Sequence, residues 1–178
     1  LSKEHVEEDV YHSWGYFSSR REESPLLIFD SPRMLRRSSD VGLGSVSQLT
    51  PYGDNCAAIV DELLTSGDNR RGEFESIMTD LVGFRVGTLP CTGGGQKKVG
   101  RRFDNGTHVD ADRMGAGVAE LAYLVAHLVT LNDRVLVVDE IEHSLHPSVL
   151  KLVLEVLKEK AVKRGLQFLI TTHSNIVV

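Results

Sequence analysis

The sequence has little cysteine and no long hydrophobic run. Its two cysteines, Cys56 and Cys91, lie far apart and form no C-x-x-C pair. A disulfide framework and a four-thiolate zinc site are therefore excluded, and a reducing cytosol fits. No apolar run approaches the roughly 20 residues that span a bilayer, and the opening LSKEHVEEDV is too polar for a signal peptide. We expect a cytoplasmic protein with no membrane partner.

The sequence also lacks an initiator methionine and an excess of positive charge. Because it begins with Leu1, we expect that the chain is processed or belongs to a longer protein. The formal net charge of −5 argues against a domain that coats nucleic acid through bulk charge, although a local basic patch stays possible. With 41% hydrophobic and 25% charged residues, the composition is that of a globular domain with its own core.

The last third of the sequence has the clearest pattern of secondary structure. Apolar residues at helical spacing predict helices over 117–131 and 148–164, the second ending at Gly165. The apolar runs 134–138 and 166–171 predict two buried strands. This order of helix, strand, helix and strand is typical of an α/β fold, with parallel strands joined by a right-handed crossover.

The middle of the sequence predicts a smaller lobe of helices and hairpins. Its patterns indicate a strand at 25–29 and helices at 55–64 and 73–83. Glycine-rich hairpins are expected over 84–110. We therefore divide the chain into an unassigned N-terminal segment, a lobe and a core, at 1–24, 25–110 and 111–178.

Polar residues follow both predicted core strands at their carboxyl ends. Asp139 and Glu140 follow the first strand, and His173 follows the second. Ligands of an open parallel sheet bind beyond these ends, and the crossover should bring the two ends side by side. One carboxylate can then hold a metal-bound water while the other contacts a reacting water, and the histidine can donate a hydrogen bond to a γ-phosphate. This division of roles suits phosphoryl transfer.

A third stretch, RMGAG at 113–117, leads directly into the helix predicted over 117–131. The backbone N–H groups at the start of that helix would form an anion site. The three stretches could then converge on one phosphate. A tight turn before a helix is the simpler alternative for this stretch, as an ordinary helix N-cap pair is for Asp139 and Glu140.

The stretches MGAGVAEL, VLVVDEIEHSLHP and LITTHS, in this order and at these distances, resemble the ABC-type branch of P-loop ATPases. The resemblance is closest to the AAA-like ATPases related to RecF, SMC and the overcoming-lysogenisation-defect (OLD) nucleases. It implies that Asp139 is the magnesium-site aspartate of a Walker B motif, that Glu140 is the catalytic glutamate and that His173 is the switch histidine.

The resemblance also implies two nucleotide-binding segments. Gly115, Ala116 and Gly117 match the signature motif, which in this family contacts the ATP held by the opposite subunit. Ala116 stands where serine is usual, so a hydroxyl contact to the γ-phosphate is lost while the backbone N–H groups remain. The family's D-loop falls on Ser144, Leu145 and His146.

As a whole, the resemblance implies a P-loop NTPase fold and an ATPase that closes as a head-to-tail homodimer around ATP and Mg²⁺. It further implies work on DNA, in processing, repair or defence against phage, often together with a nuclease. It is strong over 111–178 and fair over 25–110.

One part of such a site, the phosphate loop G-x-x-x-x-G-K-[ST] or Walker A motif, is missing. The nearest candidate is TGGGQKKVG at 92–100, but Lys97 follows glutamine, and neither Lys97 nor Lys98 precedes Ser or Thr. We interpret this stretch as a hairpin turn. The chain is then expected to be the C-terminal part of an ATPase domain, with its phosphate loop elsewhere.

Other functions stay open. The chain could be a non-catalytic binding or dimerisation module that supplies a signature surface to a partner carrying the phosphate loop. A transporter ATPase subunit is a weaker alternative, because the hairpin-rich lobe argues against it. A zinc site at His143 and His146, with Glu142, lacks a further ligand at suitable spacing.

Overall fold

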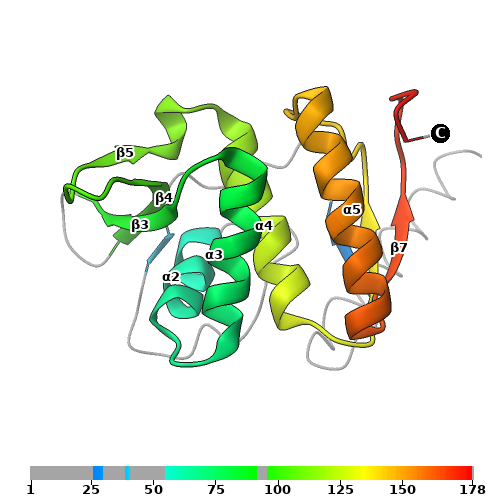
Figure 1. Cartoon of the computed structure of the whole chain (residues 1–178), viewed down its shortest axis with the longest axis horizontal. Helices are drawn as coiled ribbons and strands as arrows, with labels where there is room; N and C mark the ends of the chain where they lie inside the picture. Colours follow the sequence, from blue (N-terminus) through cyan, green and yellow to red (C-terminus); the bar gives the residue numbers. More distant parts are fainter. Residues whose placement is uncertain (1–25, 30–38, 41–54, 92–95, 178) are drawn as a thin grey trace, which may run out of the picture.

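The computed structural model describes residues 26–29, 39–40, 55–91 and 96–177, and Figure 1 shows their arrangement. A small antiparallel sheet with α2 and α3 forms one side of the molecule, and α5 with a parallel sheet forms the other. The predicted segment 1–24 and the glycines of 92–95 lie outside the described residues.

The core sheet contains the strands β1 (Leu26–Phe29), β6 (Val135–Val138) and β7 (Gln167–Ile170), in the order β1-β6-β7. Both pairings are parallel, with Phe29 opposite Val138 and Val138 opposite Ile170. The helix α5 (Pro147–Arg164) connects β6 to β7 and ends at Gly165, which has a φ of 64°. The prediction of two parallel strands joined through a helix is confirmed.

The burial of β7 differs from the prediction of a fully buried strand. In β6, Leu136 and Val138 are buried, whereas in β7 the side chain of Leu169 is 62% exposed. Phe168 and Ile170 are only half-buried. Successive residues of a strand point to opposite faces of the sheet. Within the described residues, the face that carries Leu169 is thus the less covered one. Val135 and Val137 of β6 are also only half-buried, so the prediction of complete burial is wrong for both strands.

The lobe contains the predicted helices and hairpins. Its helices are α2 (Cys56–Thr65) and α3 (Asn69–Val82), and its strands are β2 (Ser39–Asp40), β3 (Val86–Pro90), β4 (Gln96–Arg102) and β5 (His108–Asp110). The strands pair antiparallel, with β4 between β2 and β3 and with β5 also on β4. The second helix begins earlier than predicted because Asp68 caps it, accepting a hydrogen bond from the backbone N–H of Arg70 at 2.9 Å.

The helix α4 (Ala116–Thr130) follows a short 3₁₀ turn, η1 (Ala111–Arg113), and every residue from Glu120 to Val129 is buried. A helix that is apolar on all sides is expected inside a protein. It packs against α2 and α3 of the lobe. The packing thus departs twice from the predicted division at residue 110: α4 joins the lobe helices, and β1 joins the core sheet. The apolar pattern of a helix or strand does not determine which neighbouring elements its apolar face packs against.

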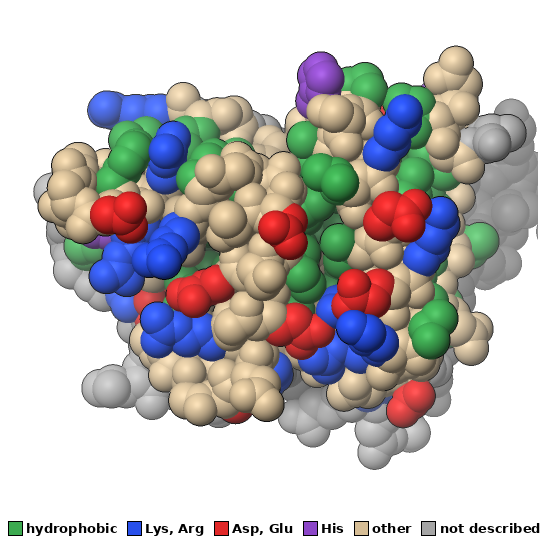
Figure 2. Space-filling view, in the orientation of Figure 1, with side chains coloured by type: hydrophobic (Ala, Val, Ile, Leu, Met, Phe, Trp, Pro, Cys, Tyr) green, Lys and Arg blue, Asp and Glu red, His purple; other side chains and the backbone are tan. Residues whose placement is uncertain are grey.

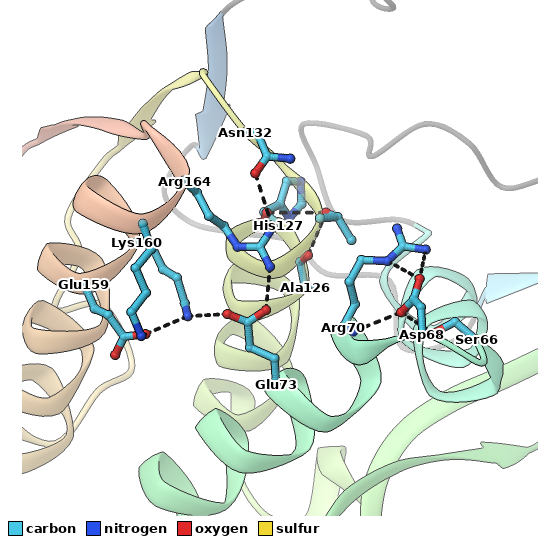
Figure 3. Close-up of polar contacts among 12 residues, drawn as sticks. Ser66, Asp68, Arg70, Glu73, Ala126, His127, Asn132, Glu159, Lys160 and Arg164 are labelled. Carbon is cyan, nitrogen blue, oxygen red and sulfur yellow. Dashed lines mark hydrogen bonds and ion pairs between the residues drawn. The ribbon is translucent and has the colours of Figure 1, made fainter.

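The lobe and the core meet at a group of ion pairs between α3 and α5, drawn in Figure 3. Lys160 of α5 is 1% exposed, and its Nζ lies 2.5 Å from Glu73 and 3.0 Å from Glu159. Arg164 binds the second oxygen of Glu73, also at 2.5 Å, and donates to Asn132 at 3.3 Å. Burial alone would raise the pKa of Glu73, but hydrogen bonds from Lys160 and Arg164 outweigh it and lower the pKa. The glutamate is therefore ionised, and it joins the two parts of the molecule.

Charged side chains of both signs are interspersed on the face drawn in Figure 2, over α3, α5 and the lobe sheet. This face therefore has the mixed surface that is usual for a folded domain. Within the described residues, no helix combines the length and apolar character needed to cross a bilayer.

His127 lies inside α4 and predicts a dependence of stability on pH. It is 1% exposed, donates from Nδ1 to the carbonyl oxygen of Tyr123 at 2.7 Å, and packs edge-on against the Tyr123 ring. Burial lowers its pKa to about 3, from 6.5, although the hydrogen bond to Tyr123 opposes this change. As the pH falls from 6.5 towards 3, the unfolded chain takes up a proton that the folded chain does not. The free energy of unfolding should therefore fall by about 1.4 kcal/mol per pH unit in this window.

Denaturant unfolding of the complete protein at several pH values measures this slope. His127→Phe should flatten it between pH 6 and 4, whereas His108→Gln, at an exposed position of β5, should not. An equal slope in wild type and His127→Phe would contradict the assignment.

Candidate functional site

The carboxyl ends of β6 and β7 are joined by hydrogen bonds around Thr171. Its backbone N–H donates to Val138 at 3.0 Å, and its carbonyl oxygen accepts from Ile141 at 3.2 Å. Its hydroxyl donates to the carboxylate of Asp139 and accepts from the backbone N–H of Glu140 at 2.8 Å. Thr171 therefore holds the first carboxylate and the backbone of the second beside the end of β7.

Glu140 ends β6 by adopting a φ of 43°, which non-glycine residues seldom adopt. The two carboxylates have different partners: that of Asp139 accepts from the hydroxyl of Thr171, and that of Glu140 lies beside His173. Its Oε1 lies 3.7 Å from Nε2 of His173. Both side chains reach solvent, with Glu140 41% and His173 86% exposed. The structure thus brings together Asp139, Glu140 and His173, three residues that the sequence predicts to share a site.

A third carboxylate, that of Glu142, joins the same two strand ends. Its Oε2 accepts from the hydroxyl of Thr172 at 2.7 Å, and its Oε1 accepts from the backbone N–H of His173 at 2.5 Å. Burial would raise the pKa of Glu142, but these hydrogen bonds outweigh burial and lower it. The carboxylate is therefore charged at neutral pH.

The segment predicted as a D-loop is a compact turn that leads into α5. The backbone N–H of His143 donates to Glu140 at 2.8 Å, and Ser144 has a positive φ of 58°. His146 caps α5: its Nδ1 accepts from the backbone N–H of Ser148 at 3.3 Å. Ser144 and His146 are both exposed at this turn, so both are accessible to a ligand.

The predicted signature motif lies against this turn. Gly115 has a φ of 103°, is exposed, and a Cβ built there would meet nothing within 4 Å. At Gly117, in contrast, a Cβ would stand 2.5 Å from the carbonyl oxygen of Ser144 and 3.7 Å from Leu145. Glycine at 117 therefore permits the close approach of α4 to the turn, and the N-terminus of α4 is open at Gly115. These contacts are with Ser144 and Leu145, so the motif touches the D-loop turn.

Another side-chain contact joins α4 to the turn. Glu120, which is only 3% exposed, lies 3.5 Å from Nδ1 of His143. The same ring nitrogen is 3.1 Å from the hydroxyl of Ser144. The helix α4 and the turn that precedes α5 are thus in contact through both backbone and side chains.

The lysines of the nearest phosphate-loop candidate are engaged elsewhere. Both lie in β4, where Lys97 pairs with the buried Asp61 at 2.6 Å and Lys98 pairs with Asp110 at 2.8 Å. Asp61 also accepts from the hydroxyl of Thr88 on β3 at 2.5 Å. Because β3 and β4 pair antiparallel, the prediction of a hairpin is confirmed.

One carboxylate of this site is suited to a magnesium ion. Among the described residues, no group of three His, Cys, Asp or Glu side chains could hold a metal ion, and Glu142 of the zinc alternative is engaged with Thr172 and His173. Mg²⁺ needs less from the protein: one or two carboxylates, with waters and substrate phosphates as the other ligands. Asp139, half-buried at a strand end, offers such a carboxylate.

Sequence reasoning missed Glu142, Thr171 and Glu120 as parts of this site. Glu142 entered only as a zinc ligand of the discounted alternative. The only local signal for Thr171 is its place at the end of a predicted strand. Each of these residues contacts a partner that is more than 20 residues away in the sequence, so no local pattern marks it.

The family described as "AAA domain, putative AbiEii toxin, Type IV TA system" matches residues 18–178 of the sequence. This match covers most of the chain, so the chain belongs to this family. It is therefore an AAA domain of this family.

No curated protein matches the sequence. Among solved structures, a similar one is described as "Crystal structure of the SmcHead bound to the C-winged helix domain of ScpA". The similarity has 17% sequence identity and a TM-score of 0.47, and it covers 60% of this chain. The chain spans 35% of the length of that protein chain.

Proposed function

We propose that the chain supplies the Walker B, signature and switch elements of a magnesium-dependent ATPase that closes as a dimer around ATP. The observation that supports this most is the set of hydrogen bonds between the ends of β6 and β7. They bring Asp139, Glu140 and His173 into one exposed site at the carboxyl end of a parallel sheet, where ligands of such sheets bind.

Each residue then has a distinct role. Glu140 polarises the attacking water, and His173 donates a hydrogen bond to the γ-phosphate. Asp139 would hold Mg²⁺, which would supply charge neutralisation at the phosphates. Catalysis of this kind depends mainly on position and on stabilised charge, which the fixed strand ends provide.

The open N-terminus of α4 serves the dimer in this proposal. Gly115, Ala116 and Gly117 present backbone N–H groups to the nucleotide of the partner subunit, while Ser144 and His146 flank it from the D-loop turn. The phosphate loop comes from a sequence outside these 178 residues, because Lys97 and Lys98 are engaged in the lobe. The biological setting that we propose is phage defence or DNA processing, together with a nuclease or toxin activity; the family description names such a toxin.

A non-catalytic module is the second candidate. The exposed Gly115 at the N-terminus of α4 is the feature that favours it, since a signature surface needs only to bind a nucleotide held by a partner. A chain of this kind would bind ATP only together with that partner, and this binding would not depend on Glu140.

The first test is the magnesium dependence of ATP hydrolysis by the complete protein. Asp139→Asn should raise the Mg²⁺ concentration needed for half-maximal rate by about 10- to 100-fold, because an amide is a weaker acceptor for a metal-bound water. Asp104→Asn is the matched control, since the side chain of Asp104 is 96% exposed in the lobe. Unchanged magnesium dependence in Asp139→Asn would refute this role, and absence of ATP hydrolysis by the wild type would favour the non-catalytic module.

A further inference from the structure

We propose that Glu142 is a positioning residue that holds the backbone of the 171–173 strand end so that His173 faces Glu140. This inference rests on the proposed function and names a residue that the Walker B, D-loop and switch assignments leave without a role. It does not require Glu142 to touch nucleotide.

Both oxygens of the Glu142 carboxylate accept hydrogen bonds. One oxygen accepts the hydroxyl of Thr172 at 2.7 Å, and the other accepts the backbone N–H of His173 at 2.5 Å. The same carboxylate thus binds a side chain and the main chain of two successive residues. Hydrogen bonds to an ionised acceptor are about twice as strong as neutral ones, and the hydrogen bonds to Glu142 lower its pKa despite the opposing effect of burial, so Glu142 is ionised.

Glu142 is itself held in place. The residue before it, Ile141, is fully buried, and its backbone N–H donates to Thr171 at 3.2 Å. The carbonyl oxygen of Glu142 accepts from Leu145 at 3.0 Å, which closes the turn on its other side. The carboxylate is therefore presented from a well-anchored segment, as a positioning group must be.

Among the described residues, no comparable anchor holds the side chain of His173. The side chain is 86% exposed, and its ring lies 3.7 Å from Glu140. The place of that ring is therefore set mainly by the backbone of residue 173, and Glu142 accepts the hydrogen bond of that backbone. Loss of Glu142 should free the strand end while Asp139 and Glu140 keep their own contacts with Thr171.

The test compares Glu142→Ala and Glu142→Gln with wild type in the complete protein. Glu142→Ala should lower kcat for ATP hydrolysis on the order of 10²-fold, since small misplacements of catalytic groups cost this much, while the Kd for ATP stays within about threefold. The amide oxygen of Glu142→Gln can still accept one of the two hydrogen bonds, so this variant should recover part of the rate. Glu155→Ala, at an exposed position on α5, is the control.

A second readout does not depend on hydrolysis. Amide hydrogen exchange at His173 should become faster in Glu142→Ala, because its hydrogen-bond acceptor is gone. If the wild type hydrolyses ATP and Glu142→Ala has the same kcat, or if exchange at His173 is unchanged, the inference is overturned while the proposed function stands. If the wild type does not hydrolyse ATP, the proposed function fails, and the positioning role of Glu142 in hydrolysis fails with it.

Discussion

Replacement of Glu140 by glutamine in the complete protein is expected to lower the rate of ATP hydrolysis by about 10²- to 10⁴-fold and to leave ATP binding intact. This is the usual contribution of a positioned general base. Glutamine has nearly the same size and keeps a hydrogen-bonding group near His173, but it cannot accept a proton from water. The backbone N–H of residue 140 still donates to Thr171, so the positive φ at this position keeps its support.

The measurement is steady-state hydrolysis together with a direct titration of Mg-ATP. If closure requires ATP, the Glu140→Gln protein should also accumulate as an ATP-bound dimer, which light scattering detects. Glu155→Gln removes an exposed carboxylate from α5 and should change neither quantity. Hydrolysis at the wild-type rate by Glu140→Gln would show that another group activates the water, and the catalytic assignment would be wrong.

Replacement of Lys160 by methionine is expected to destabilise the protein by about 3 kcal/mol. Methionine keeps most of the apolar stem and removes the charge, so the loss is mainly electrostatic. Removal of one partner from a buried ion pair typically costs 3–5 kcal/mol, because the other charge is left uncompensated. We expect a value at the lower end, because Arg164 still binds Glu73 at 2.5 Å.

Chemical denaturation measures this loss, with Lys158→Met as the control: Lys158 pairs with Glu155 on the exposed face of α5, and its side chain is 72% exposed. Exposed pairs contribute about 0–1 kcal/mol, so the control should hardly change. The double variant Lys160→Met with Glu73→Gln measures the coupling of the two side chains, because its loss should differ from the sum of the two single losses only if they interact. Equal stability of Lys160→Met and wild type would mean that the pair contributes nothing to the junction of lobe and core.

The secondary structure of the last third of the chain could be predicted closely from local pattern. The helices α4 and α5 and the strands β6 and β7 begin and end within a few residues of the predicted positions. Apolar periodicity and the glycine after α5 are local properties, and they report directly on local backbone structure. The hairpin of β3 and β4 was predicted for the same reason, from its glycines and its interrupted apolar pattern.

The grouping of these elements could not be predicted in the same way. β1 is only four residues long and pairs with β6 across more than 100 residues of sequence. α4 is apolar on all sides, and such a helix can bury itself equally well against a sheet or against other helices. Packing free energy depends on the surfaces that meet, and a linear pattern holds no information on which surfaces those are.

The same distinction applies to the candidate site. The sequence by itself determined that Asp139, Glu140 and His173 stand at the ends of apolar strands, because strand ends and residue types are local. Only the tertiary structure decided that Thr171 binds Asp139, that Glu142 holds the backbone of His173, and that Glu120 meets His143. Hydrogen bonds need atoms about 3 Å apart, and for residues some 20 to 30 positions apart in the chain, only the folded structure brings them that close.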